Sequence, residues 1–192
     1  PPRSTLFPYT TLFRSVNSYD PYDAFSWDSS YAQIPPKIKP LIEQGEIVPV
    51  LYSPATIYPQ GRMMQAMVKG ISSKQNVLKF PTLLLDSNYQ DVIPVVIGSA
   101  MARSSRLQKE DVFSIRIKDV NGAFNALDAE VVEILSIPVP TADIGTVWVN
   151  IEDLQKVKLA HEMASHFVLG KEQFSDFADD KFRYIEDRKS VV

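Results

Sequence analysis

The stretch from Val92 to Ile137 decides the fold, and it reads VIPVVIGSAMARSSRLQKEDVFSIRIKDVNGAFNALDAEVVEILSI. It opens with the apolar run Val92 to Ile97, which is short and rich in β-branched residues, as expected of a buried strand. Gly98 ends this run. Small residues and good helix formers follow, and they predict a short helix from Ser99 to Arg106.

A β-hairpin is predicted in the second half of this stretch. Apolar and polar residues alternate from Val112 to Lys118, which indicates a strand with one buried face. Asn121 and Gly122 can take the positive dihedral angles of a tight turn, and a returning strand is predicted near Ala129 to Ile137. The whole stretch therefore predicts a strand, a helix and a hairpin that bury one common face.

The rest of the chain adds further short elements. Pro49 predicts that the strand containing it lies at a sheet edge or is kinked, and Asn150 is expected to cap a helix. The pattern indicates an α+β fold of short, mostly antiparallel strands with a few packing helices, as one domain or two interlocked subdomains. The predicted strands are Ile47 to Tyr52, Ala55 to Tyr58, Arg62 to Ile71, Val147 to Ile151 and Ser165 to Leu169, and the predicted helices are Lys37 to Gln44, Glu152 to Leu159 and Gln173 to Tyr184.

Both ends of the chain resemble translated sequencing adapter rather than native protein. Pro1 to Ser15 reads PPRSTLFPYTTLFRS, and Asp187 to Val192 reads DRKSVV. We therefore expect Val16 to Glu186 to be the native part of a metagenomic fragment cut from a longer reading frame. Segments of this kind are left out of fold reasoning.

Composition excludes several classes of function. The chain of 192 residues has no cysteine, which excludes disulfides, thiol catalysis and cysteine-ligated metal sites. Without the two adapter-like segments, 16 basic and 22 acidic residues remain, a net charge of −6. That charge disfavours nucleic acid and anionic membrane surfaces as partners. The sequence also lacks an apolar run of roughly 18 residues, so this piece is not expected to span a membrane.

A search for catalytic and metal-binding patterns predicts neither an enzyme nor a bound cofactor. Gly98 and Ser99 lack the frame of a nucleophile elbow, and no phosphate-binding loop of the P-loop type occurs. His161 and His166 could belong to a metal site, but no further ligands follow at fixed spacing, so solvated or packed histidines are favoured. The acidic cluster at 176, 179 and 180 misses the calcium-loop pattern and is interpreted as a solvated helix face.

Methionines on the strand from Arg62 to Ile71 give the one candidate binding surface. Met64, Ala66 and Val68 share one face of this strand, while Met63 and Met67 share the other. Methionines in a strand usually belong to an adaptable core. If their face is exposed, Met63 and Met67 would form an apolar patch for a substrate or partner protein.

Several of these motifs resemble the extracytoplasmic domain of ABC transporter permeases of the FtsX, MacB and LolC–LolE type. The likeness covers roughly Ile47 to Gly170, and two positions depart from it, since Glu110 and Glu133 stand where glycine is usual. The motifs are VIPVVIGSAMA from Val92, the strand AEVVEI from Ala129, the segment AMVKGI that ends in Gly70-Ile71, and GTVWVN from Gly145 followed by a helix with the pair Leu154-Gln155.

The resemblance implies a role in transport across the inner membrane, with this fragment on the periplasmic side. Such a domain would couple cytoplasmic ATP hydrolysis to lipoprotein release or to efflux. ATPase activity would reside in a separate cytoplasmic subunit or domain. A permease dimer partner and a periplasmic or outer-membrane partner protein are further implied. A discontinuous membrane-proximal, porter-like subdomain is expected from residues 16–50 and 162–186, and a β-rich distal subdomain from residues 51–161.

Two alternatives remain from the sequence. The chain could be a free-standing periplasmic binding or adaptor module, or a permease-type regulator of a cell-wall hydrolase. A domain tethered by membrane helices on both sides should have its two ends on one side of the fold. We therefore expect residues near Val16 and Glu186 to emerge on the same side.

Overall fold

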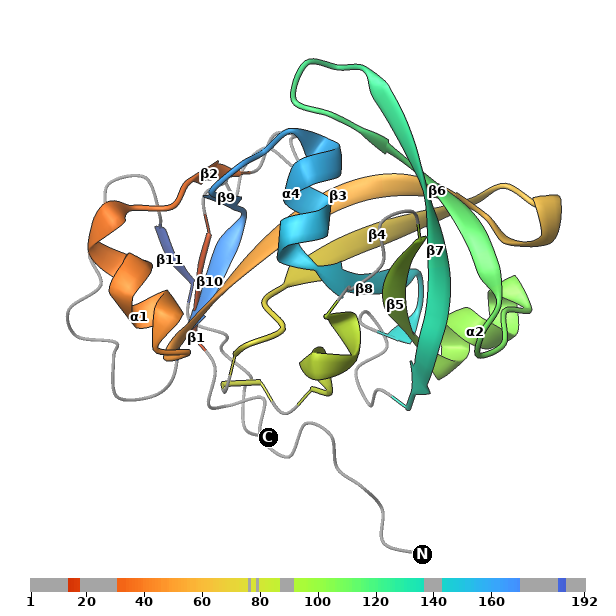
Figure 1. Cartoon of the computed structure of the whole chain (residues 1–192), viewed down its shortest axis with the longest axis horizontal. Coiled ribbons are helices and arrows are strands. Elements are labelled where there is room, and N and C mark those ends of the chain that lie inside the picture. The colour runs from red at the N-terminus through yellow and green to blue at the C-terminus, as the bar shows by residue number, and fades with distance from the viewer. Residues whose placement is uncertain are drawn as a thin grey trace, which may run out of the picture.

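The computed structural model describes residues 14–17, 31–75, 77–78, 80–86, 92–136, 143–169 and 183–185. These residues form an α+β fold, as predicted (Figure 1). The strands are β1 (Arg14–Asn17), β2 (Ala32–Gln33), β3 (Ile47–Tyr58), β4 (Met64–Ile71), β5 (Val92–Gly98), β6 (Val112–Lys118), β7 (Phe124–Leu135), β8 (Thr146–Asn150), β9 (Met163–Ala164), β10 (His166–Leu169) and β11 (Arg183–Ile185). The helices are α1 (Lys39–Glu43), α2 (Ser99–Ser105) and α4 (Ile151–Lys158), with 3-10 turns η2 (Pro36–Ile38), η3 (Pro59–Gly61) and η4 (Thr82–Leu85).

Six strands close into a barrel. They run in the order β3, β4, β8, β5, β7 and β6, and β6 pairs back with β3 through the register Ala55↔Ile117 to Tyr58↔Ser114. The pairs β4–β8 and β5–β7 are parallel, and the other pairs of the barrel are antiparallel. Closure removes the exposed edges that an open sheet would present.

The barrel interior is filled by side chains at alternate positions of its strands. On β3, Leu51, Ala55 and Ile57 point inward, whereas Val50 and Tyr52 belong to the outer face. This alternation follows from the two-residue period of a strand. Helix α4 adds Ile151, Leu154 and Val157 to the same core. As predicted, the Asn150 side chain caps α4 by accepting a hydrogen bond of 3.1 Å from the Glu152 backbone N–H.

Strand β3 extends beyond the barrel and carries a second group of strands. Its first residues pair with β10, which pairs with β1, which pairs with β11. Pro49 lies where β3 has β10 on one side and β4 has not yet begun, and Pro54 lies where only β4 pairs with it. At both places the proline's missing N–H interrupts no ladder. The predicted break between two strands is therefore wrong, since β3 continues through Ser53 and Pro54.

Other boundaries also differ from the prediction. The returning strand β7 begins at Phe124 rather than Ala129, because Asp119 organises the turn before it. The Asp119 Oδ1 accepts hydrogen bonds from the backbone N–H groups of Asn121 and Ala123. In this turn only Gly122 has a positive φ. Residues 183–185 form β11, so the end of the predicted helix from 173 to 184 is wrong, and residues 173–182 lie outside the described part.

The two departures from the family pattern fall at unusual backbone geometry. Glu110 has a φ of 73°, in the left-handed region that glycine adopts without strain. Glu133 follows an irregularity in the β5–β7 ladder, where Val95 pairs with Val131 but Val96 pairs with Glu133. One extra residue is therefore accommodated in β7 as a bulge. The positive φ at Glu110 explains why glycine would fit there, although this chain uses glutamate.

Gly70 sets how closely α4 approaches the barrel. A Cβ atom at this position would lie 2.9 Å from the Ile151 Cα and 3.1 Å from the Leu154 Cδ2. Contacts this short require the helix to shift. The glycine of the AMVKGI segment and the helix with the Leu154-Gln155 pair are therefore two parts of one contact.

Replacing Gly70 with alanine is expected to lower the free energy of unfolding by about 1–3 kcal/mol, because the added methyl group pushes α4 off β4. Urea unfolding followed by circular dichroism measures this change. Gln65→Ala, on the exposed side of the same strand, is the control and should stay within about 0.5 kcal/mol of the wild type. Equal stability of the wild type and Gly70→Ala would show that the close approach of α4 is not required.

Candidate functional site

The first and last described strands lie side by side. Strands β1 and β11 are antiparallel, and within the part expected to be native Val16 lies opposite Tyr184 and Asn17 opposite Arg183. The chain therefore enters β1 next to the point where it leaves β11. This confirms the expectation that residues near Val16 and the segment before Glu186 meet on one side of the fold.

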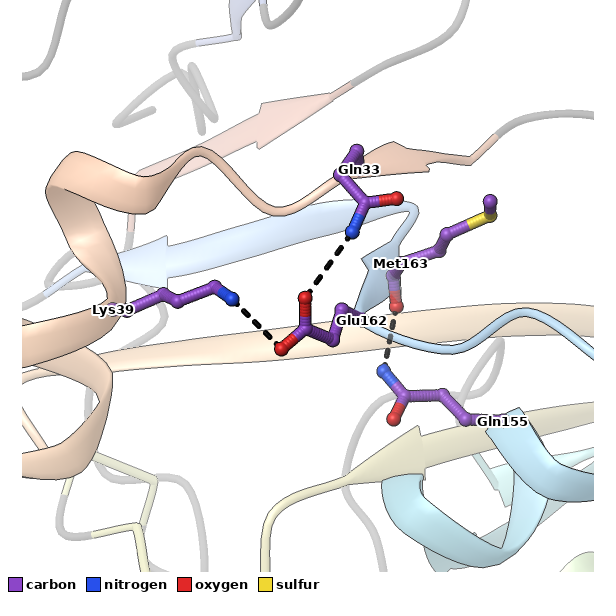
Figure 2. A network of polar contacts seen from close by, with 5 residues as sticks. All are labelled: Gln33, Lys39, Gln155, Glu162 and Met163. Carbon is purple, nitrogen blue, oxygen red and sulfur yellow. Dashed lines mark hydrogen bonds and ion pairs between the residues drawn. The ribbon is translucent and has the colours of Figure 1, made fainter.

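A polar network joins α1 to the turn that follows α4. Figure 2 shows the Glu162 carboxylate between Lys39 of α1 and Gln33 of β2. The Lys39 Nζ lies 2.7 Å from Glu162 Oε1, and the Gln33 Nε2 donates to Glu162 Oε2 at 3.4 Å. The Lys39 hydrogen bond and charge hold the pKa of Glu162 below its ordinary value of 4.5.

Gln155 extends this network to helix α4. Its Nε2 donates to the Met163 backbone oxygen at 2.9 Å, as Figure 2 shows. Met163 belongs to β9, which pairs with β2 through Gln33↔Met163. The neighbouring Leu154 is 1% exposed in the barrel core. The Leu154-Gln155 pair thus places one side chain in the barrel and the other at the joint between α4 and the β2–β9 ladder.

The two methionines proposed from the sequence have different environments. Met63 is 70% exposed and precedes β4, whereas Met67 lies within β4 and is half-buried. About four strand residues separate them, or roughly 13 Å along the strand. Exposed Gln65 lies between them. The structure therefore gives an exposed Met63 and a half-buried Met67.

Beside Met67, the outer face of the barrel carries a cation between two aromatic rings. Lys69 on β4 is in register with Tyr52 on β3 and with Trp148 on β8. Its Nζ lies 5.1 Å from the centre of the Tyr52 ring and 5.2 Å from that of the Trp148 ring. Contacts of this length are cation–π interactions. Burial lowers the pKa of Lys69.

His166 lies against the same cluster. Its ring centre is 4.6 Å from that of Tyr52, and its Nε2 is 3.2 Å from the Tyr52 hydroxyl. Burial and the charge of Lys69 together lower the pKa of His166 to about 3. The imidazole is therefore neutral near pH 7.

The sequence did not identify the Tyr52–Lys69–Trp148 cluster, because its members come from three strands far apart in the chain. Only the strand register brings them into one row. Each is a large polar or aromatic residue at an outward position of its strand, which is the signal that could have pointed to them.

Within the part of the chain that the structure describes, the two histidines do not belong to a metal site. His161 is exposed, whereas His166 is buried against Tyr52. Within the described ranges, no three or more histidine, aspartate or glutamate side chains are arranged to hold a metal ion. The acidic cluster at 176, 179 and 180 lies outside those ranges.

Comparisons with known proteins identify the fold. No protein-family model matches the chain, and no curated protein sequence matches it significantly. The solved periplasmic region of MacB from Actinobacillus actinomycetemcomitans is 13% identical over 89% of this chain and 78% of that chain, with a TM-score of 0.54. The extracellular domain of the noncanonic ABC-type transporter YknZ from Gram-positive bacteria is 9% identical over 90% of this chain and 99% of that chain, with a TM-score of 0.55. The chain therefore has the fold of these two domains, as the sequence motifs predicted.

Among the described residues, no helix is both long and apolar enough to cross a membrane.

Removing the Lys39 charge should raise the pKa of Glu162 toward 4.5. We expect this shift in Lys39→Met when the Glu162 carboxyl carbon is followed by NMR from pH 2 to 7. Because the folded pKa lies below the unfolded one, the ion pair contributes stability above pH 4.5, and this contribution is lost as the pH falls through the folded value.

The matched control for this titration is Lys109→Met. Lys109 pairs with Glu133 at 3.1 Å and lowers the pKa of that carboxyl in the same way. The control should raise the pKa of Glu133 and leave that of Glu162 unchanged. A Glu162 pKa that is the same with and without Lys39 would mean that this ion pair does not hold α1 to the turn after α4.

Proposed function

We propose that this chain is the extracytoplasmic domain of an ABC transporter permease, which couples cytoplasmic ATP hydrolysis to movement of a substrate outside the inner membrane. The pairing of β1 with β11 supports this most directly, since a domain held between two membrane helices needs its chain to enter and leave on one side. The fold shared with the MacB and YknZ domains supports it independently. The domain itself carries no catalytic role in this proposal.

The fold suits the transmission of motion by a rigid body. A displacement applied at β1 and β11 passes through β10 into β3, and β3 continues into the barrel wall. A second path connects α1 to α4. It consists of the Lys39–Glu162 ion pair and the hydrogen bond from Gln155 to the backbone oxygen of Met163, the next residue after Glu162. Two parallel paths resist bending between the strands at the chain ends and the barrel.

The proposed partners follow from this role. A cytoplasmic ATPase subunit or domain supplies the energy, and a second permease forms the dimer. The membrane-proximal subdomain comprises 16–50 and 162–186, and the distal subdomain comprises 51–161. A periplasmic or outer-membrane protein would bind the distal subdomain, where Met63 offers an exposed apolar side chain.

Lipoprotein release and efflux are the two substrate classes that we propose for this domain. A free-standing periplasmic binding or adaptor module is the second candidate. A cavity of about 500 Å³ beside η4 would favour that function, since such volumes suit small ligands. A regulator of a cell-wall hydrolase would use the same tethered fold without a transported substrate. The uncut reading frame separates these cases, because only tethered domains require a membrane helix on each side.

Cysteine labelling in the whole protein tests the location. These 192 residues hold no cysteine, so Met63→Cys gives this domain one thiol, at an exposed position. In cells with a permeabilised outer membrane, we expect a membrane-impermeant maleimide to label this thiol without lysis.

The control is Val131→Cys, because Val131 is fully buried in the barrel and its thiol should stay unlabelled until the protein is denatured. Labelling of Met63→Cys only after the inner membrane is broken would place the domain in the cytoplasm and reject the proposal. A flanking reading frame without membrane helices would reject it as well.

A further inference from the structure

The Lys69 ammonium on the outer face of the barrel has no acidic partner among the described residues. Its contacts are the faces of the Tyr52 and Trp148 rings, which are weaker partners than a carboxylate. Burial already lowers its pKa, so the folded chain holds this cation at a cost. A charge kept in such a place without an ion pair suggests a role in binding.

Two further polar atoms of the same cluster lack partners. The Trp148 Nε1 and the His166 Nδ1 are buried without a hydrogen bond within the described part of the chain. The residue His166 is only 7% exposed. Buried donors and acceptors are nearly always paired, and exceptions call for an explanation. An indole N–H can only donate, so the cluster holds a donor on Trp148 besides the Lys69 ammonium.

A cavity with both apolar and polar lining residues lies one aromatic ring away from this cation. The Phe80 ring lies 5.1 Å from the Trp148 ring, and Phe80 also lines the cavity of about 500 Å³ beside η4. Pro81 and Leu84 line the cavity too, and Leu83 at its wall is 77% exposed. Pockets of this size, with apolar walls and a few polar groups, are typical small-molecule sites.

We propose that this face binds an amphiphilic anion, with its carboxylate or phosphate head on Lys69 and Trp148 and its apolar body against Phe80 and the η4 cavity. His166 is neutral near pH 7 and positions the Tyr52 ring through their hydrogen bond. The inference goes beyond the proposed transport role and does not depend on it, because ligand binding is measured on the domain by itself.

Titration of the full chain with octanoate tests the proposal, using the indole N–H signals in a proton–nitrogen NMR spectrum. The chain has two tryptophans, so Trp27→Phe assigns the signal of Trp148. Octanoate is expected to shift that signal saturably. Octanol has the same tail without the charge and should bind at least about tenfold more weakly. Octyl phosphate is the second anion, and the tighter of the two anions identifies the class of head group.

The decisive variant is Lys69→Met, which keeps the length of the side chain and removes its charge. It should weaken octanoate binding at least about tenfold, whereas Lys74→Met, at an exposed lysine lining the same cavity, should change it by less than about threefold. Octanoate binding that survives Lys69→Met, or that is lost instead in Lys74→Met, overturns the proposal. If Lys69→Met does not fold, the comparison of octanoate with octanol on the wild type decides, and equal affinities overturn it.

Discussion

One strand, β3, belongs to two pairing systems at once, and the rest of the structure depends on that sharing. Its first four residues pair with β10, its residues from Val50 to Ile57 pair with β4, and its last four pair with β6, which closes the barrel. Between these regions, Ser53 and Pro54 continue the strand with β4 as the sole ladder partner in the described sheet. Closing the barrel therefore also fixes the position of the strands at the chain ends.

This sharing has mechanical consequences. A strand that is hydrogen-bonded at both ends cannot rotate at its middle without breaking one of the ladders. Helix α4 reinforces it, because Leu154 enters the barrel core while Gln155 donates a hydrogen bond to Met163 of β9. Gly70 permits that packing by leaving no side chain between β4 and α4. The fold is thus suited to moving as one piece, which is what the proposed transport role requires.

Local sequence patterns predicted the parts of this fold that depend on neighbouring residues. The apolar run from Val92, the alternation from Val112 to Lys118, and the Asn150 cap each have a short-range physical cause, and the structure confirms all three. Closure between β3 and β6 could not be read in this way, since it joins residues about sixty positions apart and leaves no local signature. For the same reason, the sequence did not predict the row of Tyr52, Lys69 and Trp148. Met63 could be named as an exposed candidate, but the covering of Met67 depends on tertiary packing.

Amide hydrogen exchange along β3 is the most direct test of the claim that this strand makes the two regions one body. The amides of Val48 and Val50, beside β10, should open with the same free energy as those of Ile57 and Thr56 in the barrel wall. Their opening free energies should also fall together as urea is added. Exchange of the first pair through a separate opening of lower free energy, insensitive to urea while the barrel stays closed, would contradict the account.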